Sequence, residues 1–336
     1  MDRFLTFLET KTVKYLTKRK AKQLYIKTKK KTFFTELVDW FDALVFAIFW
    51  IILINQYLFQ LFVIPSPSMV STLLVGDRVI VNKDAYGVEL YPSGKKVATE
   101  SRRVQRDEII TFYNPEYDSK GPWFDILSQV VYMGTISLVN IDKNPDGTPA
   151  ERLYVKRAVG MPGDVVKLEN GDVDIKVAGT GEFVDEEVFR ESEELSTGPN
   201  RTLSDEAFSY YSGLKANASL KVYDELGINQ YPQYLLSEAT KLANSSYNYI
   251  FDLYEYNHTM AETKAMLDPS DMTYRSESAK YESGIYIPED YVLPLGDNRD
   301  NSYDGRFFGP VPETKINGQV VGRFWPLNRI SSLIGK

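Results

Sequence analysis

The sequence predicts a mainly β fold: an antiparallel β-domain preceded by one N-terminal transmembrane helix and interrupted by a partly helical insertion. Three observations lead to this prediction. Residues 43–64 contain no charge, short runs with strand-like alternation follow them, and residues 180–285 become rich in Tyr, Ser, Asn and Glu. A chain of 336 residues is also long enough to bury a large core.

The first 36 residues are strongly basic. They carry eleven Lys and Arg against three Asp and Glu, a net charge of +8 that leaves −15 for the rest of a chain whose total is −7. A basic segment before an acidic body is typical of proteins that bind nucleic acid or an anionic membrane surface. The uncharged run that follows favours the membrane, with the basic segment either lying on its surface as a helix or simply solvated.

The uncharged run 43–64 has the length of a membrane span. Its 22 residues would extend ~33 Å as a helix, enough for a hydrocarbon core of ~30 Å. A buried helix of a soluble protein is the alternative, although such a helix rarely needs so long an uncharged run. A cleaved signal is not expected, because 42 residues precede the run and no small-x-small site follows it.

Strand patterns dominate after the span. Residues 78–82, 108–112 and 153–159 read as strands, and 165–177 as a hairpin with an Asn-Gly turn. The apolar stretch 126–141 is too short and too often interrupted for a second span, so we interpret it as a core segment or one that rests on the membrane.

The stretch 180–285 has helical spacing at 220–226 and 234–242, and we interpret it as an insertion within one β-domain. The predicted divisions are a basic segment at 1–42, a transmembrane helix at 43–64, the first part of the β-domain at 65–179, the insertion at 180–285 and the second part at 286–336.

The composition limits the possible chemistry. The absence of cysteine excludes disulfides, thiol nucleophiles and cysteine–zinc sites, and a single histidine excludes histidine-rich metal sites. A Ser-His-Asp triad would depend on His258 alone.

Three segments carry candidate chemistry: Pro65-Ser66-Pro67-Ser68-Met69, the run around Lys156, and Gly296-Asp297-Asn298-Arg299-Asp300. A serine nucleophile needs a base within hydrogen-bond reach, and a lysine can serve if burial lowers its pKa. The apolar neighbours of Lys156 favour such burial. A linker serine and a strand lysine that points to solvent are the alternatives.

Together these segments resemble the type I signal peptidases, bacterial Ser–Lys proteases that cleave leader peptides from exported proteins. The resemblance covers 62–88, 106–112, 153–166 and 286–325, and Gly-Asp-Asn-Arg-Asp-Asn-Ser-x-Asp at 296–304 is its most specific part. It implies that Ser68 is the nucleophile, Lys156 the general base, Ser66 an oxyanion donor beside the Ser68 N–H, and Ser302 the residue that orients Lys156.

The resemblance further implies that Asp304 and Arg306 form a supporting ion pair. It implies pockets for small residues at positions −1 and −3 of the cleavage site, lined by Phe62, Ile64, Met69, Leu73, Tyr154 and Val155. It implies preproteins with signal peptides and the lipid bilayer as partners, and neither nucleic acid, nor metal, nor any cofactor. With the positive-inside rule, it places the N-terminus in the bacterial cytoplasm and the catalytic domain on the outer face of the cytoplasmic membrane, after a single span.

Three positions depart from the family pattern. Ser71 stands where proline is usual, Arg106-Asp107-Glu108 replaces Arg-Gly-Asp, and Gly305 replaces a serine.

Other functions fit less of the sequence. Ser212-x-x-Lys215 matches the first motif of penicillin-binding proteins, but its Ser-Asp-Asn and Lys-Thr-Gly partners are missing. A LexA-like self-cleaving repressor would need a DNA-binding head where this chain has an apolar run. A membrane-anchored scaffold on a degenerate peptidase fold remains the non-enzyme alternative.

Overall fold

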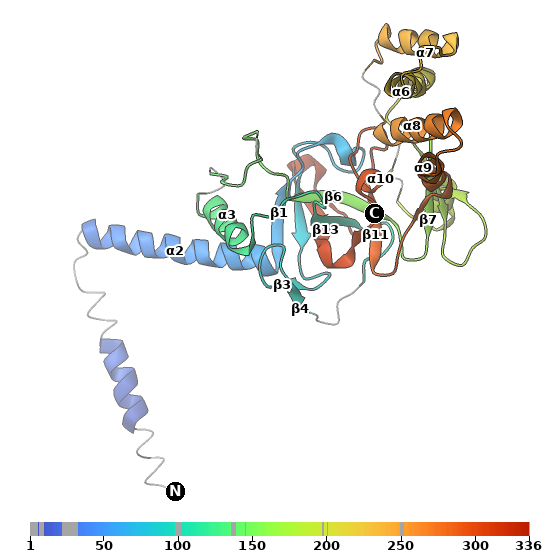
Figure 1. Cartoon of the computed structure of the whole chain (residues 1–336). Coiled ribbons are helices and arrows are strands. Elements are labelled where there is room, and N and C mark those ends of the chain that lie inside the picture. Colours follow the sequence, from blue (N-terminus) through green and yellow to red (C-terminus); the bar gives the residue numbers. More distant parts are fainter. Residues whose placement is uncertain are drawn as a thin grey trace. The chain divides into compact units, whose positions relative to one another are not determined.

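The computed structural model describes residues 6, 10–21, 33–97, 103–135, 139–144, 146–196, 198–199, 201–248 and 252–335. These form two compact units, Met1–Ile52 and Leu53–Lys336, each of which is described by itself (Figure 1). In the first unit, residues 10–21 are helical and exposed, within the segment predicted to be basic.

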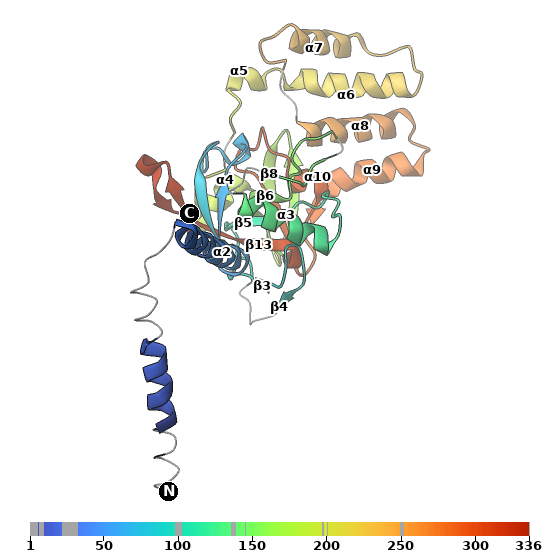
Figure 2. The same cartoon turned by 90° about the vertical axis from the view of Figure 1, so that its left-hand side faces the viewer.

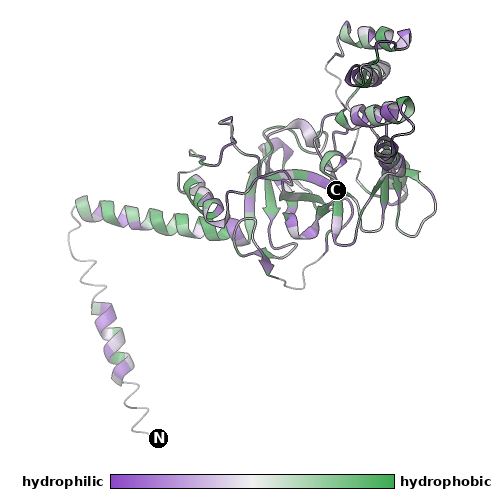
Figure 3. Ribbon diagram, viewed as in Figure 1, coloured by the Kyte–Doolittle hydropathy of each residue, from purple (hydrophilic) through white to green (hydrophobic). Residues whose placement is uncertain are grey.

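Helix α2, Phe33–Tyr57, begins in the first unit and ends in the second. Its part Glu36–Tyr57 is the one helix, among the residues described, that is long and apolar enough to cross a membrane. Figure 3 shows the apolar character along most of its length.

The predicted helix boundaries of 43–64 are wrong at both ends. The helix begins ten residues earlier and ends at Tyr57, after which Phe59–Val63 form strand β1. The N–H of Leu58 still bonds to the carbonyl of Ile54 at 2.9 Å, and the chain then pairs with β2. Composition alone hides this change, because a helix and a strand of apolar residues are equally uncharged.

The main sheet is antiparallel and curls into a half-barrel. Its strands follow the order β1-β2-β13-β5-β6-β11-β12, and β14 pairs with β13. The strand predictions at 78–82, 108–112 and 153–159 are confirmed to within one residue at each end. The bounds are β2 Arg78–Asn82, β5 Ile109–Tyr113, β6 Leu153–Gly160, β11 Tyr291–Leu295, β12 Val311–Pro312, β13 Ile316–Trp325 and β14 Ser331–Ser332.

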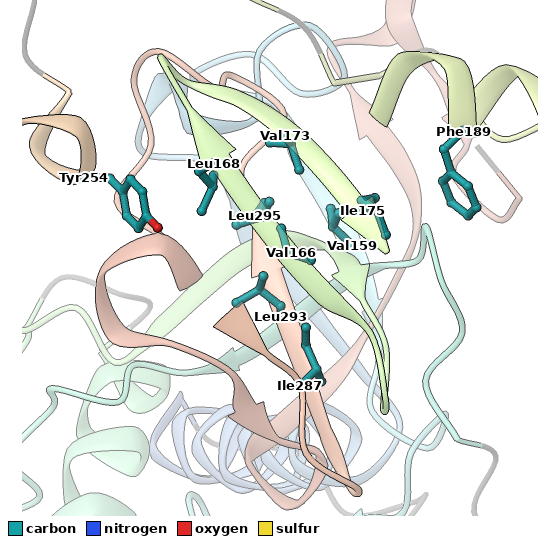
Figure 4. Packing of buried hydrophobic residues seen from close by; sticks show 10 residues of the cluster. All are labelled: Val159, Val166, Leu168, Val173, Ile175, Phe189, Tyr254, Ile287, Leu293 and Leu295. Carbon is teal, nitrogen blue, oxygen red and sulfur yellow. The ribbon is translucent and has the colours of Figure 1, made fainter. Parts of the chain in front are cut away.

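A second antiparallel sheet, in the order β10-β7-β8-β9, packs against the end of the first. The predicted hairpin is confirmed as β7 Val165–Glu169 and β8 Asp172–Lys176, with both turn residues, Asn170 and Gly171, at positive φ. Figure 4 shows side chains of this hairpin facing Val159 of β6 and Leu293 and Leu295 of β11. This shared core fixes the ends of β6 and β11. The short strands are β9 Val184–Asp185 and β10 Ile285–Tyr286.

The insertion is more helical than predicted. The helical spacings at 220–226 and 234–242 lie in α6, Tyr211–Glu225, and α7, Gln233–Ala243. Figure 2 shows α7, α6, α8 and α9 side by side in one layer, an order that their contacts share. The other helices of the insertion are α4 Glu186–Ser192, α5 Asp205–Phe208, α8 Leu253–Leu267 and α9 Met272–Ser283.

The remaining short elements surround the main sheet. The stretch predicted as a core or membrane-resting segment contributes to α3, Pro122–Gly134. A two-stranded hairpin, β3 with β4, follows β2. The bounds of the other elements are β3 Val88–Glu89, β4 Lys96–Val97, α10 Gly305–Phe308 and the 3-10 turns η1 Pro67–Met69, η2 Glu313–Lys315 and η3 Leu327–Arg329.

Candidate active site

Ser68 lies in η1, one turn of 3-10 helix that follows shortly after β1. Pro67 occupies the start of this turn, where its fixed φ suits the conformation and its missing N–H leaves no donor unsatisfied. The Val70 N–H closes the turn by donating to the Pro67 carbonyl at 3.1 Å. The turn therefore holds Ser68 in one backbone conformation, with its side chain buried.

Lys156 approaches Ser68 from the middle of the main sheet. It lies on β6, opposite Ile110 of β5, and only 4% of its surface is exposed. Its Nζ lies 2.8 Å from Ser68 Oγ, although 88 residues separate the two in the chain. The ammonium also lies 5.5 Å from the centre of the Tyr154 ring. The alternative of a solvent-facing strand lysine is excluded.

Burial lowers the pKa of Lys156 from 10.5 to about 8. Desolvation is the main cause, and the nearby Arg306 guanidinium acts in the same direction, whereas Asp304 and Asp297 favour the charged form. A substantial fraction of the amine is therefore neutral at slightly alkaline pH. A neutral amine has a lone pair that can accept the Ser68 proton.

Ser66 lies beside the same serine. Its hydroxyl donates to Ser68 Oγ at 3.3 Å, and the residue is exposed while Ser68 is buried. This hydrogen bond shows that the two hydroxyls lie next to each other, with only Pro67 between the residues in the chain.

The segment 296–306 is hydrogen-bonded to η1, the turn that carries Ser68 and is called the serine turn below. The Asn298 N–H donates to the Ser68 carbonyl at 3.1 Å, and the Asn298 amide donates to the Pro67 carbonyl at 3.2 Å. Gly296 lies closer still: a Cβ at this position would come within 2.6 Å of the Ser68 carbonyl oxygen and 2.1 Å of Ser302 Oγ. Only glycine fits there without displacing one of these atoms.

Asp304 and Arg306, at the end of this segment, form a buried ion pair in which Arg306 Nε lies 2.9 Å from Asp304 Oδ1. The other Asp304 oxygen accepts the Gly296 N–H at 2.8 Å. Arg306 outweighs burial and keeps the pKa of Asp304 below its ordinary value. Among the described residues, the structure shows no hydrogen bond between Ser302 Oγ and Lys156. The Ser302 hydroxyl acts instead on Asp304, where it helps to lower the pKa of the carboxylate.

Five of the six residues predicted to line substrate pockets lie in one apolar cluster. Ile64, Met69, Leu73 and Val155 are buried in it, and Phe62 packs against it half-buried. Tyr154 lies instead in a neighbouring cluster, with its ring stacked on Phe308 at 6.2 Å between centroids.

Sequence reasoning missed a second buried ionic group. Arg157, the neighbour of Lys156, is fully buried and binds both carboxylate oxygens of Asp297, each at 2.7 Å. The same carboxylate accepts a hydrogen bond from Thr72 in the loop after Ser68. Successive strand residues point to opposite faces, so β6 supplies Lys156 to one face and Arg157 to the other. The one sign of this buried ionic group in the sequence is Asp297, a charged residue within the most specific motif.

The competing candidates are engaged elsewhere. The Ser212 hydroxyl donates to Glu238 at 2.7 Å and the Lys215 ammonium pairs with Glu255 at 2.8 Å, so this Ser-x-x-Lys pattern forms no dyad. His258 lies on α8 with its ring stacked on Tyr281 at 5.0 Å.

Comparison with known proteins identifies the family of this chain. The family model described as "Signal peptidase, peptidase S26" matches residues 37–325, most of the chain. The chain belongs to this family. It is 25% identical over 325 residues to signal peptidase I of Buchnera aphidicola from Acyrthosiphon pisum, covering 91% of this chain and 84% of the relative. It is 27% identical over 270 residues to signal peptidase I of Haemophilus influenzae, covering 80% and 64%. A 66-residue stretch, 19% of this chain and 32% of the relative, is 46% identical to signal peptidase I of Leptolyngbya laminosa.

These findings make the chain a bacterial type I signal peptidase of the S26 family. Its structure accounts for two of the three positions at which the sequence departs from the family pattern. Asp107, at the place of a usual glycine, has φ 74°, a conformation that glycine adopts readily. Its carboxylate pairs with Arg157 at 3.2 Å and with Arg190 of α4, contacts that offset the strain. A Cβ on Gly305 would lie 2.7 Å from Leu293 Cδ1, which explains the glycine.

Ser71, the third departure, ties the serine turn to the insertion. Its hydroxyl donates to the Gly198 carbonyl at 2.8 Å. Farther along, Arg201 binds Asp300 at 2.5 Å and Thr202 binds Asn298 at 2.9 Å. The first part of the insertion thus lies against the segments that hold Ser68.

Proposed function

We propose that this S26 signal peptidase is a membrane-bound serine endopeptidase in which Ser68 is the nucleophile and Lys156 the general base. The observation that carries the proposal is the buried 2.8 Å contact between Nζ and Oγ, with the pKa of the amine lowered to about 8. A buried lysine beside a serine hydroxyl serves no packing purpose that an apolar residue would not serve better.

The reaction follows from these positions. The neutral Lys156 amine takes the Ser68 proton while Oγ attacks the carbonyl carbon of the scissile peptide bond. The Ser66 hydroxyl and the Ser68 N–H stabilise the developing oxyanion. The Lys156 ammonium then returns its proton to the leaving amine. Water, deprotonated by the same lysine, hydrolyses the acyl-enzyme and releases Ser68.

Specificity is assigned to the apolar surface beside Ser68. In an extended substrate, side chains two residues apart point to the same face, so positions −1 and −3 reach one surface together. The cluster of Phe62, Ile64, Met69, Leu73 and Val155 is proposed to form that surface, and Tyr154 would contribute from the neighbouring cluster. Because four of these side chains are already buried against one another, only small substrate residues would fit.

The membrane location follows from the apolar helix and the charge. Helix α2 crosses the cytoplasmic membrane, and the basic segment before it stays in the cytoplasm by the positive-inside rule. The catalytic domain then lies on the outer face, next to the bilayer that holds the apolar core of a signal peptide.

The test is cleavage of a purified preprotein by the full chain in detergent. Ser68→Ala should abolish cleavage. Lys156→Arg should do the same, because a guanidinium stays protonated and cannot act as a base. His258→Ala is the matched control and should cleave like the wild type. Cleavage by Ser68→Ala, or its loss in folded His258→Ala, would refute the Ser–Lys assignment.

A further inference from the structure

Helix α3 exposes the face that a helix in a water-soluble domain would bury. Its polar residues Asp125 and Ser128 are 1% and 4% exposed, whereas Trp123, Leu127 and Val130 are 85%, 54% and 41% exposed. The three apolar residues are spaced by four and three positions and therefore lie on one face. At these five positions the usual arrangement, with apolar residues inward and polar residues outward, is reversed.

A buried ionic network fixes α3 in this orientation. Asp125 pairs with Arg152 at 3.2 Å and accepts the Ser93 hydroxyl at 3.1 Å. Arg152 also donates to Ser128 Oγ at 2.7 Å and pairs with Asp142. A buried carboxylate without its partners is costly, so rotating the apolar face inward would be strongly unfavourable. The outward position of Trp123 is therefore built into the fold.

The same region is connected to the end of α2. The Tyr57 hydroxyl donates to the Leu90 carbonyl at 3.1 Å, and the Gln56 amide donates to the Glu89 carbonyl at 3.2 Å. Leu90 and Ser93 belong to the same hairpin, between β3 and β4, and Ser93 bonds to Asp125 of α3. One short hairpin thus joins the last turn of the candidate span to the base of α3.

We propose that α3 is a second membrane contact, lying in the plane of the bilayer with Trp123, Leu127 and Val130 in its interfacial layer. Lipid is the occupant because hydrogen bonds through the β3–β4 hairpin connect α3 to the end of α2, the candidate span. Tryptophan is also favoured at the level of the lipid headgroups, where its ring is half apolar and half polar. The proposal rests on the proposed membrane anchoring by α2, and not on the roles of Ser68 and Lys156. Two contacts would hold the catalytic domain in one orientation above the membrane, which a single span cannot do.

The test uses the absence of cysteine from the chain. A single cysteine replaces Leu127 in the full chain and carries an environment-sensitive nitrobenzoxadiazole dye. The labelled protein is reconstituted in phosphatidylcholine vesicles with or without acyl-chain nitroxide lipids. We expect blue-shifted emission that the nitroxide lipids quench and aqueous iodide does not. The matched control is the same label at Glu282, an exposed position on α9, where we expect quenching by iodide.

Two results would overturn the proposal. Quenching of the Leu127 label by iodide alone would show a face open to water. Blue-shifted emission that nitroxide lipids leave unchanged, and that depends on the number of proteins per vesicle, would show that a second copy covers the face. Neither readout requires cleavage, so failure here is distinct from failure of the proposed protease activity.

A pair of variants connects the contact to processing. Trp123→Glu with Leu127→Glu should cleave a short soluble peptide in detergent like the wild type, which shows an intact site. The same double variant should process a vesicle-embedded preprotein more slowly, while Trp123→Phe with Leu127→Ile retains the wild-type rate. Equal processing by both pairs would contradict a membrane role for this face.

Discussion

The chemistry proposed for this signal peptidase depends on one side chain, the buried amine of Lys156, whose environment disfavours its charged form. Desolvation lowers its pKa more than Asp304 and Asp297 raise it. The same burial that would allow Lys156 to act as a base therefore carries a cost in stability, and both effects can be measured.

Activity should rise with pH through the pKa of Lys156. Only the neutral amine accepts a proton, so kcat/KM should increase roughly tenfold per pH unit below the pKa and level off above it. With the pKa of Lys156 at about 8, the midpoint is expected near that pH in the free enzyme. Peptide cleavage at substrate concentrations far below KM, from pH 6 to pH 10, measures it. A flat profile across this range would contradict a lysine base.

Replacing Lys156 by methionine should stabilise the protein while abolishing activity. The folded-state pKa of about 8 lies below the ordinary 10.5, so the unfolded chain binds more protons between these values and stability rises with pH in that window. At pH 7 the buried charge costs up to about 3 kcal/mol, which Lys156→Met removes. Thermal unfolding should give a higher Tm for the variant at pH 7 and a smaller advantage at pH 10. A variant less stable at pH 7 would show that the hydrogen bond to Ser68 outweighs the burial of charge.

Ser66 is expected to act only in the transition state. Ser66→Ala should lower kcat by roughly two to three orders of magnitude with KM little changed, as for other single oxyanion donors. Ser66→Thr keeps a hydroxyl and should retain part of the activity. Steady-state kinetics on a preprotein measures both, and a wild-type kcat for Ser66→Ala would leave backbone N–H groups as the only donors.

At the scale of elements, the site is made where three short segments meet: the turn η1, strand β6 and the segment 296–306. Strand β6 presents Lys156 on one face and Arg157 on the other, and Arg157 binds Asp297 of the third segment. That segment in turn bonds to the carbonyls of Pro67 and Ser68. Displacing any one of the three should move Ser68 relative to Lys156.

Gly296→Ala tests this coupling. The added Cβ would come 2.1 Å from Ser302 Oγ and 2.6 Å from the Ser68 carbonyl oxygen, so we expect the serine turn to shift together with Ser302. A misplacement of about 1 Å can reduce catalysis roughly a hundredfold, which is the loss of kcat we expect. Gly181→Ala is the control, because no heavy atom lies within 4 Å of its added Cβ. Kinetics together with Tm separates a shifted turn from an unfolded protein. A wild-type kcat would contradict the coupling, because it would show that the added Cβ is accommodated without moving Ser68 relative to Lys156.

At the scale of the whole molecule, the protein combines an apolar helix with an acidic domain in which the insertion lies against the active-site segments. The contact of Ser71 with Gly198 and that of Arg201 with Asp300 make the insertion part of the support of the site.

The proposed topology can be tested with single cysteines in this cysteine-free chain. A cysteine at Lys20, in the exposed helix before α2, should resist a membrane-impermeant maleimide in intact cells and react after lysis. A cysteine at Glu282 should react in intact cells. The reverse pattern, or labelling of both positions in intact cells, would contradict a single span with a cytoplasmic N-terminus.

Elements that depend on near neighbours could be predicted from the sequence. Period-two alternation located β2, β5, β6 and the β7–β8 hairpin, and the 3.6-residue period located α6 and α7. Short motifs also marked the segments that carry Ser68 and Lys156. Such patterns can be read locally, because each residue's face is set by its position along its own element.

Features that depend on distant partners could not be predicted from the sequence. The end of α2 at Tyr57 follows from pairing between β1 and β2, and the burial of Lys156 follows from its place between β5 and β11. The outward apolar face of α3 follows from the pairing of Asp125 with Arg152. In each case the deciding energy comes from a contact between residues far apart in the chain, which no local pattern of charge or hydropathy records.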